Sequence, residues 1–277
     1  MGLPKFLCIG AQKAGTSWLY AQLQSHPEVW MPPVKELQFF NHLYVPEHRA
    51  WTSWHIRQGA ARALAYHVGR PEPPDFGYVR YLADLATRDP FTEDWYRRAF
   101  DRAGAHGRLV GDITPEYSTI PEAGIRHLRG LLGAVKVVYI LRAPLERALS
   151  QLRMNVARHS PDRLTAERWV EFADQWDIDN RGDYRAYVPR WKAHFAAADL
   201  LFLPYGRIAR DPMGLLREVE AFLGLTPQDD YPRLRERVHA TGRLAVPAAV
   251  ERRLAERLAP QAAFLAEEFG PAFAEAT

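Results

Sequence analysis

The sequence predicts an α/β fold, in which a parallel β-sheet is flanked by helices. Two observations support this class: four short apolar, β-rich runs are spread along the 277 residues, and helical patterns lie between and after them. Strands separated by helices favour parallel pairing, because the crossover helices then cover both faces of the sheet. With 47% hydrophobic and 25% charged residues, the composition is that of an ordinary globular protein with a sizeable core.

The first strand and helix are expected at the N-terminus. The run "KFLCIG" (5–10) has the continuous apolar character of a buried strand, and "TSWLYAQLQS" (16–25) is helical up to Pro27. Cys8 falls in this strand, where it is interpreted as a small buried hydrophobe. As the single cysteine, it excludes an intrachain disulfide.

Three further strands are expected at "LVGDI" (109–113), "VKVVYIL" (135–141) and "LLFLPY" (200–205). Helical patterns lie around them, starting at Pro144 and covering 184–198 and 211–224. In the last pattern, Asp211 is the expected N-cap, Pro212 the first helical residue and Gly224 the C-terminal stop. Residues 43–108 differ: they are rich in aromatic side chains, contain "PEPP" and show no clear strand run. We expect helices and loops laid over the sheet there.

The charge balance excludes several classes of partner. Thirty-six basic and 33 acidic residues give a net charge of +3 without a long single-sign run, which fits a small anionic ligand better than a nucleic acid. No window approaches the roughly 18 consecutive apolar residues of a membrane span. The N-terminus lacks the apolar region and cleavage site of a signal peptide, so we expect a cytoplasmic protein. The ten histidines are scattered without metal-ligand spacing, so no metal is expected.

The loop "CIGAQKAGTSW" after the first strand predicts a phosphate site. A Walker A loop reads G-x-x-x-x-G-K-[ST]; here Gly10 and Gly15 keep the spacing, but Thr16 stands where the lysine would be. Because the loop joins a strand to a helix, backbone N–H groups face one spot beyond the strand. Thr16 and Ser17 add hydroxyl donors, and Lys13 adds a point charge. The alternative is a tight turn with a solvated lysine.

A second strand end carries Arg142, directly after "VKVVYIL", with Ser150 two helical turns later. An arginine here would bind a second phosphate through its forked guanidinium, and the serine hydroxyl would add a further hydrogen bond to it. Taken alone, Arg142 suits a surface ion pair equally well, and Ser150 suits an ordinary helix position. Together with the loop, they indicate a nucleotide that carries phosphates at two separate places.

The ordered set "GAQKAGTSWLYAQLQSHP", "KELQFFN", "VVYILRAPLERALS" and "ATGRLAVP" resembles the sulfotransferases that use 3'-phosphoadenosine 5'-phosphosulfate (PAPS). The likeness is greatest to the heparan sulfate N- and 3-O-sulfotransferase branch and its bacterial relatives. It runs from residue 6 to the C-terminal helix, interrupted in the aromatic stretch. The resemblance implies one sulfotransferase domain over 1–277 with a P-loop-like sheet. It implies sulfuryl transfer from PAPS to a hydroxyl, in preference to an amine, of a small-molecule or glycan acceptor, leaving 3'-phosphoadenosine 5'-phosphate (PAP).

The resemblance also assigns roles to single residues. Lys13 would act at the oxygen that leaves the sulfur, while its loop holds the 5'-phosphate, and Arg142 with Ser150 would hold the 3'-phosphate. The expected cofactor-binding residues are Gly10, Gln12, Lys13, Ala14, Gly15, Thr16, Ser17, Arg142, Ser150, Gly242 and Arg243. Arg243 is expected to carry the charge of the late cofactor loop, because Thr241 stands where the family commonly has a basic residue.

Glu36 in "VKELQFFN" is the expected catalytic base. An acceptor hydroxyl must lose a proton during in-line transfer, and by the resemblance Glu36 occupies the position of the glutamate that the family uses for this step. The Phe39 and Phe40 rings would shield the site from water. The alternative is a surface glutamate beside Lys35. Weaker candidates for the base are His26 and His42.

The residues expected on the acceptor side are Phe40, Asp112, Glu116 and Tyr184. In "VGDITPEYS" the heparan enzymes carry a lysine where this chain has Ile113, so either another basic residue replaces it or the acceptor binds differently. Capping or turn hydrogen bonds suit Asp112 at least equally well. Tyr184 and Trp191 fit the family's spacing, and a core position is favoured for Trp191.

Two departures from the family affect the cofactor and acceptor sites. The heparan enzymes carry a disulfide-bearing segment before the late loop, which one cysteine cannot form, so the adenine would stack elsewhere, near His239. An insertion of about 43–93 separates Asn41 from Asp94-Trp95-Tyr96. This aromatic insertion is either an acceptor lid, since aromatic surfaces suit sugar rings, aryl groups and lipid-like chains, or a satellite core. Its exposed parts would also suit a homodimer interface.

Two other functions stay open. A P-loop kinase or NTPase would need a lysine directly after Gly15, which is absent, and a carboxylate after a second strand, which Asp112 would mimic. A non-catalytic nucleotide-binding module would show decay at the catalytic positions, yet Lys13, Arg142 and Ser150 are present. The residues do not identify the acceptor, and they do not distinguish secondary metabolism from glycan modification.

Overall fold

The computed structural model describes residues 2–88, 90–159, 165–236 and 244–277. Five strands form one parallel sheet in the order β2-β3-β1-β4-β5. They are β1 (Phe6–Cys8), β2 (Val29–Trp30), β3 (Leu109–Ile113), β4 (Lys136–Leu141) and β5 (Leu200–Pro204). The expected α/β class is confirmed, and so are the four expected strands. The edge strand β2 was not expected, because two residues are too few to show a pattern.

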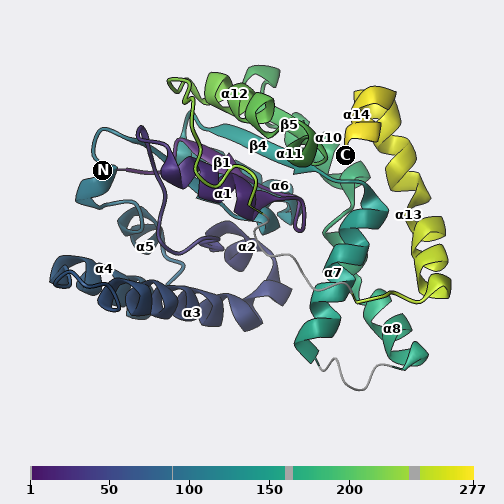
Figure 1. Ribbon diagram of the computed structural model, residues 1–277, viewed down its shortest axis with the longest axis horizontal. Coiled ribbons are helices and arrows are strands. Elements are labelled where there is room, and N and C mark those ends of the chain that lie inside the picture. Colours follow the sequence, from purple (N-terminus) through teal and green to yellow (C-terminus); the bar gives the residue numbers. More distant parts are fainter. Residues whose placement is uncertain (1, 89, 160–164, 237–243) are drawn as a thin grey trace.

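Helices lie around the sheet (Figure 1). They are α1 (Thr16–Ser25), α2 (Phe39–Tyr44), α3 (Arg49–Val68), α4 (Phe76–Thr87), α5 (Glu93–Arg98), α6 (Glu122–Leu132), α7 (Pro144–His159), α8 (Ala166–Ala173), α9 (Trp176–Asn180), α10 (Tyr184–Lys192), α11 (Arg207–Arg210), α12 (Pro212–Leu223), α13 (Ala248–Phe269) and α14 (Pro271–Ala276). None of the described helices has both the length and the apolar character needed to cross a bilayer.

The expected capping signals of α12 are confirmed. The Asp211 carboxylate accepts a hydrogen bond from the Gly214 N–H at 3.0 Å, and Gly224 ends the helix in the left-handed conformation with φ of 72°. Pro212 occupies the first turn, where its missing N–H costs nothing. Helix α1 also has the bounds that its pattern predicts.

The main core surrounds the sheet, and a smaller core joins α7, α8 and α13 through residues such as Leu149, Trp169 and Leu254. The aromatic insertion is divided between core and surface. Trp95 and Tyr96 are buried in the main core, whereas Tyr66 and Phe76 are each 77% exposed. In Figure 1, α3 and α4 form a pair set apart from the sheet, so only part of the insertion lies over it. The homodimer interface stays a prediction.

Gly111 sets the spacing between β3 and β1. It faces Phe6 across the strand pair, and a Cβ at Gly111 would fall inside the buried Phe6 ring. We expect Gly111→Ala to lower the free energy of unfolding by about 1–3 kcal/mol through overpacking, measured by urea denaturation. Gly130→Ala is the matched control: a Cβ there meets nothing within 4 Å, and α6 should gain about 0.5–1 kcal/mol. Equal stability of the two variants would contradict the packing argument.

Candidate active site

Three neighbouring strands deliver polar side chains to one edge of the sheet. β3, β1 and β4 are adjacent and parallel, so their carboxyl ends bring Glu116, the loop after β1 and Arg142 together. The Gln12 side-chain amide donates to the Glu116 carboxylate at 3.1 Å. Arg142 donates from Nη1 to the Lys13 carbonyl at 2.8 Å. The loop after β1 is therefore held from both sides.

The N-terminus of α1 is built to receive an anion. Gly15 precedes it in the left-handed conformation with φ of 83°, no side chain caps the helix, and its first turn contains no acidic residue. The first N–H groups of the helix are thus free for a negatively charged group, and the helix dipole favours one. The left-handed conformation favours glycine, and a Cβ at Gly15 would also displace the end of the Ile208 side chain.

Lys13 lies in this loop, half-buried, with its ammonium 3.7 Å from the Met154 sulfur. Burial lowers the pKa of Lys13, and the positive charges of Arg158 and Arg142 lower it further, while Glu36 acts in the opposite direction. The Lys13 ammonium therefore lies near two other positive charges. Such a cluster is suited to a ligand with several negative charges.

Glu36 lies close enough to Lys13 for their charges to interact. Its carboxylate accepts hydrogen bonds from the Lys35 ammonium and, at 3.3 Å, from the Gln38 amide, and its side chain is 28% exposed. Burial raises the pKa of Glu36, but Lys35, His55 and Arg181 outweigh this effect, so the pKa lies below its ordinary value. The group is thus a carboxylate that can accept a proton.

Both residues expected to be catalytic have left-handed backbone conformations. The φ angle is 69° at Lys13 and 66° at Glu36. Non-glycine residues rarely adopt such angles, which cost of order 1–3 kcal/mol and cluster at functional sites. The strain at two residues whose charges meet is independent support for a site here.

Arg142 is fixed by more contacts than its position after β4 predicts. Its guanidinium lies over the Tyr205 ring, 4.4 Å from the centroid, and its Nη2 lies 3.6 Å from the Glu146 carboxylate. Its Nε is buried without a partner among the described residues. Ser150 is half-buried on α7, and its hydroxyl likewise has no hydrogen-bond partner in the described part of the chain. Both therefore have capacity for a ligand.

Sequence reasoning missed Arg181. It binds Glu116 at 3.1 Å and Asp177 at 2.7 Å and so connects α9 to the Gln12 contact. Burial raises the pKa of Glu116, and the charge of Arg181 only partly offsets this rise. The i, i+4 spacing from Asp177 indicates an ion pair at the C-terminal end of α9, but nothing in the sequence indicates Glu116, 65 positions away from Arg181. Glu116 thus holds the loop after β1 in place through Gln12.

All four residues expected on the acceptor side are buried, including Glu116, which is 2% exposed and paired with Arg181. Phe40 is buried among aromatic rings. Asp112 is 1% exposed and accepts hydrogen bonds from the hydroxyls of Tyr96, Thr114 and Tyr117. The Tyr184 hydroxyl donates to the Arg142 carbonyl at 2.9 Å. Internal packing and hydrogen bonding thus take these side chains, and the expected core position of Trp191 matches its complete burial.

The remaining expected residues fall into two groups. Gly242 and Arg243, together with Thr241 and His239, lie outside the described residues. The two histidines considered as alternative bases make internal contacts: His26 binds the Thr226 carbonyl at 3.1 Å, and the His42 ring stacks on Phe91. Within the described ranges, no group of three or more histidine, cysteine or carboxylate side chains is arranged to hold a metal ion.

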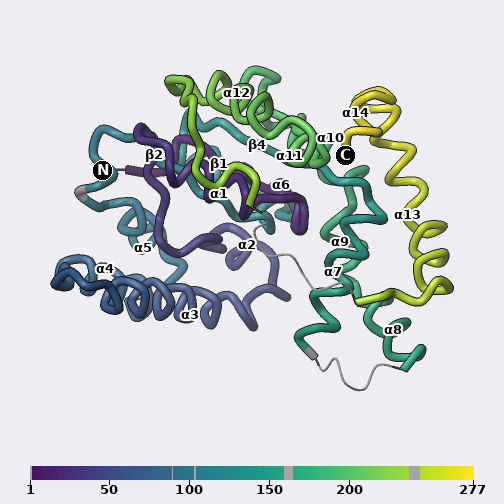
Figure 2. Tube along the Cα trace, viewed as in Figure 1, coloured from purple at the N-terminus to yellow at the C-terminus, as the bar shows by residue number. Residues whose placement is uncertain are grey.

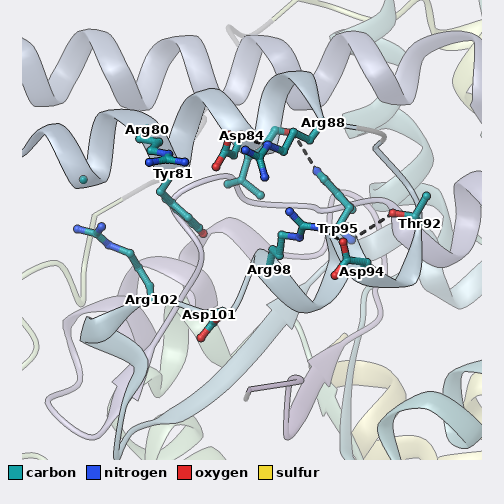
Figure 3. A pocket seen from close by; sticks show the side chains of 12 residues that line it. Arg80, Tyr81, Asp84, Arg88, Thr92, Asp94, Trp95, Arg98, Asp101 and Arg102 are labelled. Carbon is teal, nitrogen blue, oxygen red and sulfur yellow. Dashed lines mark hydrogen bonds and ion pairs between the residues drawn. The ribbon is translucent and has the colours of Figure 1, made fainter.

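A cavity of about 670 Å³ lies elsewhere, between α4 and α5 (Figure 3). Its arginine side chains are largely paired: Arg88 binds Asp84 at 3.0 Å, and Arg98 binds Asp94. The Trp95 indole donates to the Leu85 carbonyl at 2.9 Å. Figure 1 places α4 and α7 on opposite sides of the molecule, so this cavity is separate from the strand ends that carry Lys13 and Arg142.

Comparison with known proteins gives a consistent set of relatives. A sequence model of the "Sulfotransferase family" matches residues 4–230. The chain is 27% identical over 246 residues to the bifunctional heparan sulfate N-deacetylase/N-sulfotransferase 4 of Mus musculus, covering 83% of this chain and 23% of that protein. It is 26% identical over 230 residues to heparan sulfate glucosamine 3-O-sulfotransferase 3A1 of Mus musculus, covering 80% and 46%. The chain thus spans less than half the length of either relative.

The fold is similar to the crystal structure of a sulfotransferase from Alicyclobacillus acidocaldarius, with a TM-score of 0.65, 24% identity and 96% coverage of both chains.

Proposed function

Because this chain belongs to the sulfotransferase family, we propose that it transfers a sulfuryl group from PAPS to a hydroxyl, in preference to an amine, of a small-molecule or glycan acceptor. One observation carries the proposal. Lys13 lies in the loop after β1 beside an uncapped helix N-terminus, its charge interacts with that of the Glu36 carboxylate, and both residues have strained backbones. This pair offers the acid and the base that sulfuryl transfer requires.

The residues present fit the donor nucleotide. The N-terminus of α1, with Thr16 and Ser17, would hold the 5'-phosphate. The unpartnered Nε of Arg142 and the Ser150 hydroxyl would hold the 3'-phosphate, the group that distinguishes PAPS from ATP. PAPS supplies a sulfuryl group whose bond to the 5'-phosphate oxygen breaks as the acceptor oxygen bonds to sulfur, which leaves PAP.

The protein's own side chains provide the proton transfer and the charge. Glu36 takes the proton of the acceptor hydroxyl at a carboxylate oxygen, and the Lys13 ammonium donates toward the departing phosphate oxygen. Lys35 supplies the second ammonium in place of the family lysine at Ile113. In support, Ile113 is 1% exposed, whereas the Lys35 ammonium contacts Glu36.

The proposal is tested by calorimetric titration of the protein with PAP and, separately, with ATP and Mg²⁺. We expect PAP alone to bind tightly. Arg142→Ala should weaken PAP binding by about 10- to 100-fold, because it removes charge-assisted hydrogen bonds to a phosphate and frees the Lys13 carbonyl. Arg62→Ala, at an exposed position of α3, is the matched control and should bind like the wild type.

The alternative functions predict different titrations. Binding of ATP with Mg²⁺ and none of PAP would replace the proposal by a P-loop kinase or NTPase. Tight PAP binding without sulfuryl transfer to any acceptor would favour the non-catalytic module.

A further inference from the structure

A strip of aromatic rings extends from the base to α9. His55 on α3 binds the Lys35 carbonyl at 3.0 Å, next to Glu36. The His55 ring lies edge-on to Trp51, with centroids 6.1 Å apart, and His48 lies 5.4 Å from Trp51 and 6.1 Å from Trp176. We call Trp51, His55, His48 and Trp176 the aromatic strip. Trp176 is 50% exposed although it is large and apolar, so the strip ends at an accessible face.

A close approach between the α3 backbone and the Val34 side chain holds the strip beside the Glu36 segment. Gly59 on α3 lies against Val34, two residues before the base, and a Cβ at Gly59 would lie 2.6 Å from a Val34 methyl. Together with the His55 contact, this packing ties the first turns of α3 to the Glu36 segment. At the other end, α9 packs on α7 (Figure 2), and Arg181 follows it. The aromatic strip therefore lies beside the expected base, and the helices that carry it are packed against their neighbours.

The charged groups near the strip do not suit a polyanion. Among the described residues beside Glu36, the cations Lys35 and Arg181 are both paired with carboxylates. Lys35 is paired with Glu36, and Arg181 is paired with both Glu116 and Asp177, so neither cation is left over for an anionic acceptor. Burial and the nearby charge of Arg181 lower the pKa of His48 to about 4, which keeps it neutral at physiological pH. Lys13, whose charge interacts with Glu36, lies near Arg142 and Arg158 on the side proposed for the donor.

We propose that the acceptor is an uncharged molecule whose hydroxyl-bearing ring stacks on Trp51 and Trp176, and not a polyanionic glycan like heparan sulfate. This inference rests on the proposed function and names the substrate class of the same site. Aromatic faces bind flat aryl rings and the apolar faces of sugars. A chain of repeated negative charges would instead meet carboxylates that already hold the available cations.

The inference is tested with three acceptor probes: 2-naphthol, octyl glucoside and an unsulfated heparosan oligosaccharide. Binding is measured by calorimetry on the PAP-bound protein, and sulfation is measured with PAPS. We expect a neutral probe to bind and to be sulfated, with the preferred one showing whether the ring is aryl or sugar, and heparosan to do neither. Trp176→Ala and Trp51→Ala should each weaken binding and raise KM for that probe about 5- to 10-fold. Values of kcat should stay within about threefold, and Trp176→Phe should restore most of the affinity.

Tyr66→Ala is the matched control, since this exposed aromatic residue lies on the same helix 15 residues beyond Trp51, about 22 Å along the axis. It should leave binding and KM unchanged. Sulfation of heparosan alone would overturn the inference, as would a lack of binding by both neutral probes to PAP-bound protein or unchanged binding in both tryptophan variants. Failure to bind PAP would instead overturn the proposed function itself, so the two failures are distinguishable.

Discussion

Lys13→Met is expected to lower kcat for sulfuryl transfer by about 10²–10³-fold, the usual cost of removing one preorganised donor to developing negative charge. Methionine keeps the length of the side chain and its contact with Met154 but removes the ammonium. The measurement is steady-state sulfation with the preferred acceptor. Because the Lys13 carbonyl still accepts from Arg142, the loop should keep its shape and PAP affinity should fall much less than kcat.

The pH dependence of sulfuryl transfer is a second test of the role of Lys13. The pKa of Lys13 is lowered from 10.5, first by burial and then by Arg158 and Arg142. The ammonium is the active form, so wild-type kcat/KM, which reports pKa values of the ligand-free protein, should fall as the pH rises through this lowered pKa, below pH 10.5. Lys13→Met should lack that alkaline limb. Lys5→Met, at an exposed lysine, is the control and should keep both kcat and the limb. If Lys13→Met retained a tenth of the wild-type kcat, Lys13 would not be the group at the leaving oxygen.

Glu36→Gln is expected to lower kcat by about 10²–10⁴-fold, since an amide cannot take the acceptor proton. The variant keeps the size of the side chain and an oxygen that can accept from Lys35 and Gln38. PAP affinity should change little, because the proposed role of Glu36 is toward the acceptor and not toward the donor nucleotide. Glu122→Gln, at an exposed position of α6, is the matched control and should be fully active.

The acid limb of the pH profile reports on the same group. Burial raises the pKa of Glu36, but Lys35, His55 and Arg181 bring the net pKa below its ordinary value. The carboxylate is the active form, so kcat/KM should be lost only as the pH falls through this depressed pKa, and it should be flat from there to neutrality. A limb between pH 6 and 7 would instead identify a histidine as the base and would remove Glu36 from the mechanism.

The phosphate loop and the central strands follow from local patterns in the sequence. "KFLCIG", "VKVVYIL" and the Asp211 to Gly224 pattern carry their own apolar runs and caps, so the strands, α12 and the position of Lys13 could be predicted. The order of the strands then places Arg142 beside the loop. These features are readable because each depends on neighbours a few residues apart.

The acceptor side was less predictable. Asp112 and Tyr184 fit acceptor positions by motif, yet both are buried and hydrogen-bonded to their own protein. Whether a polar side chain faces a ligand or the core depends on which distant segments pack on it. A single sequence contains no record of that packing.

The sequence by itself determined the α/β class, the loop that carries Lys13, and Glu36 as the residue to test as the base. Only the tertiary structure decided that Arg181 reaches Glu116, that Glu36 comes near Lys13, and that Trp176 ends an aromatic strip that includes Trp51. The physical reason is distance along the chain. Contacts such as Gln12 to Glu116, 104 positions apart, form because folding buries apolar surface elsewhere, and that burial brings these polar groups together.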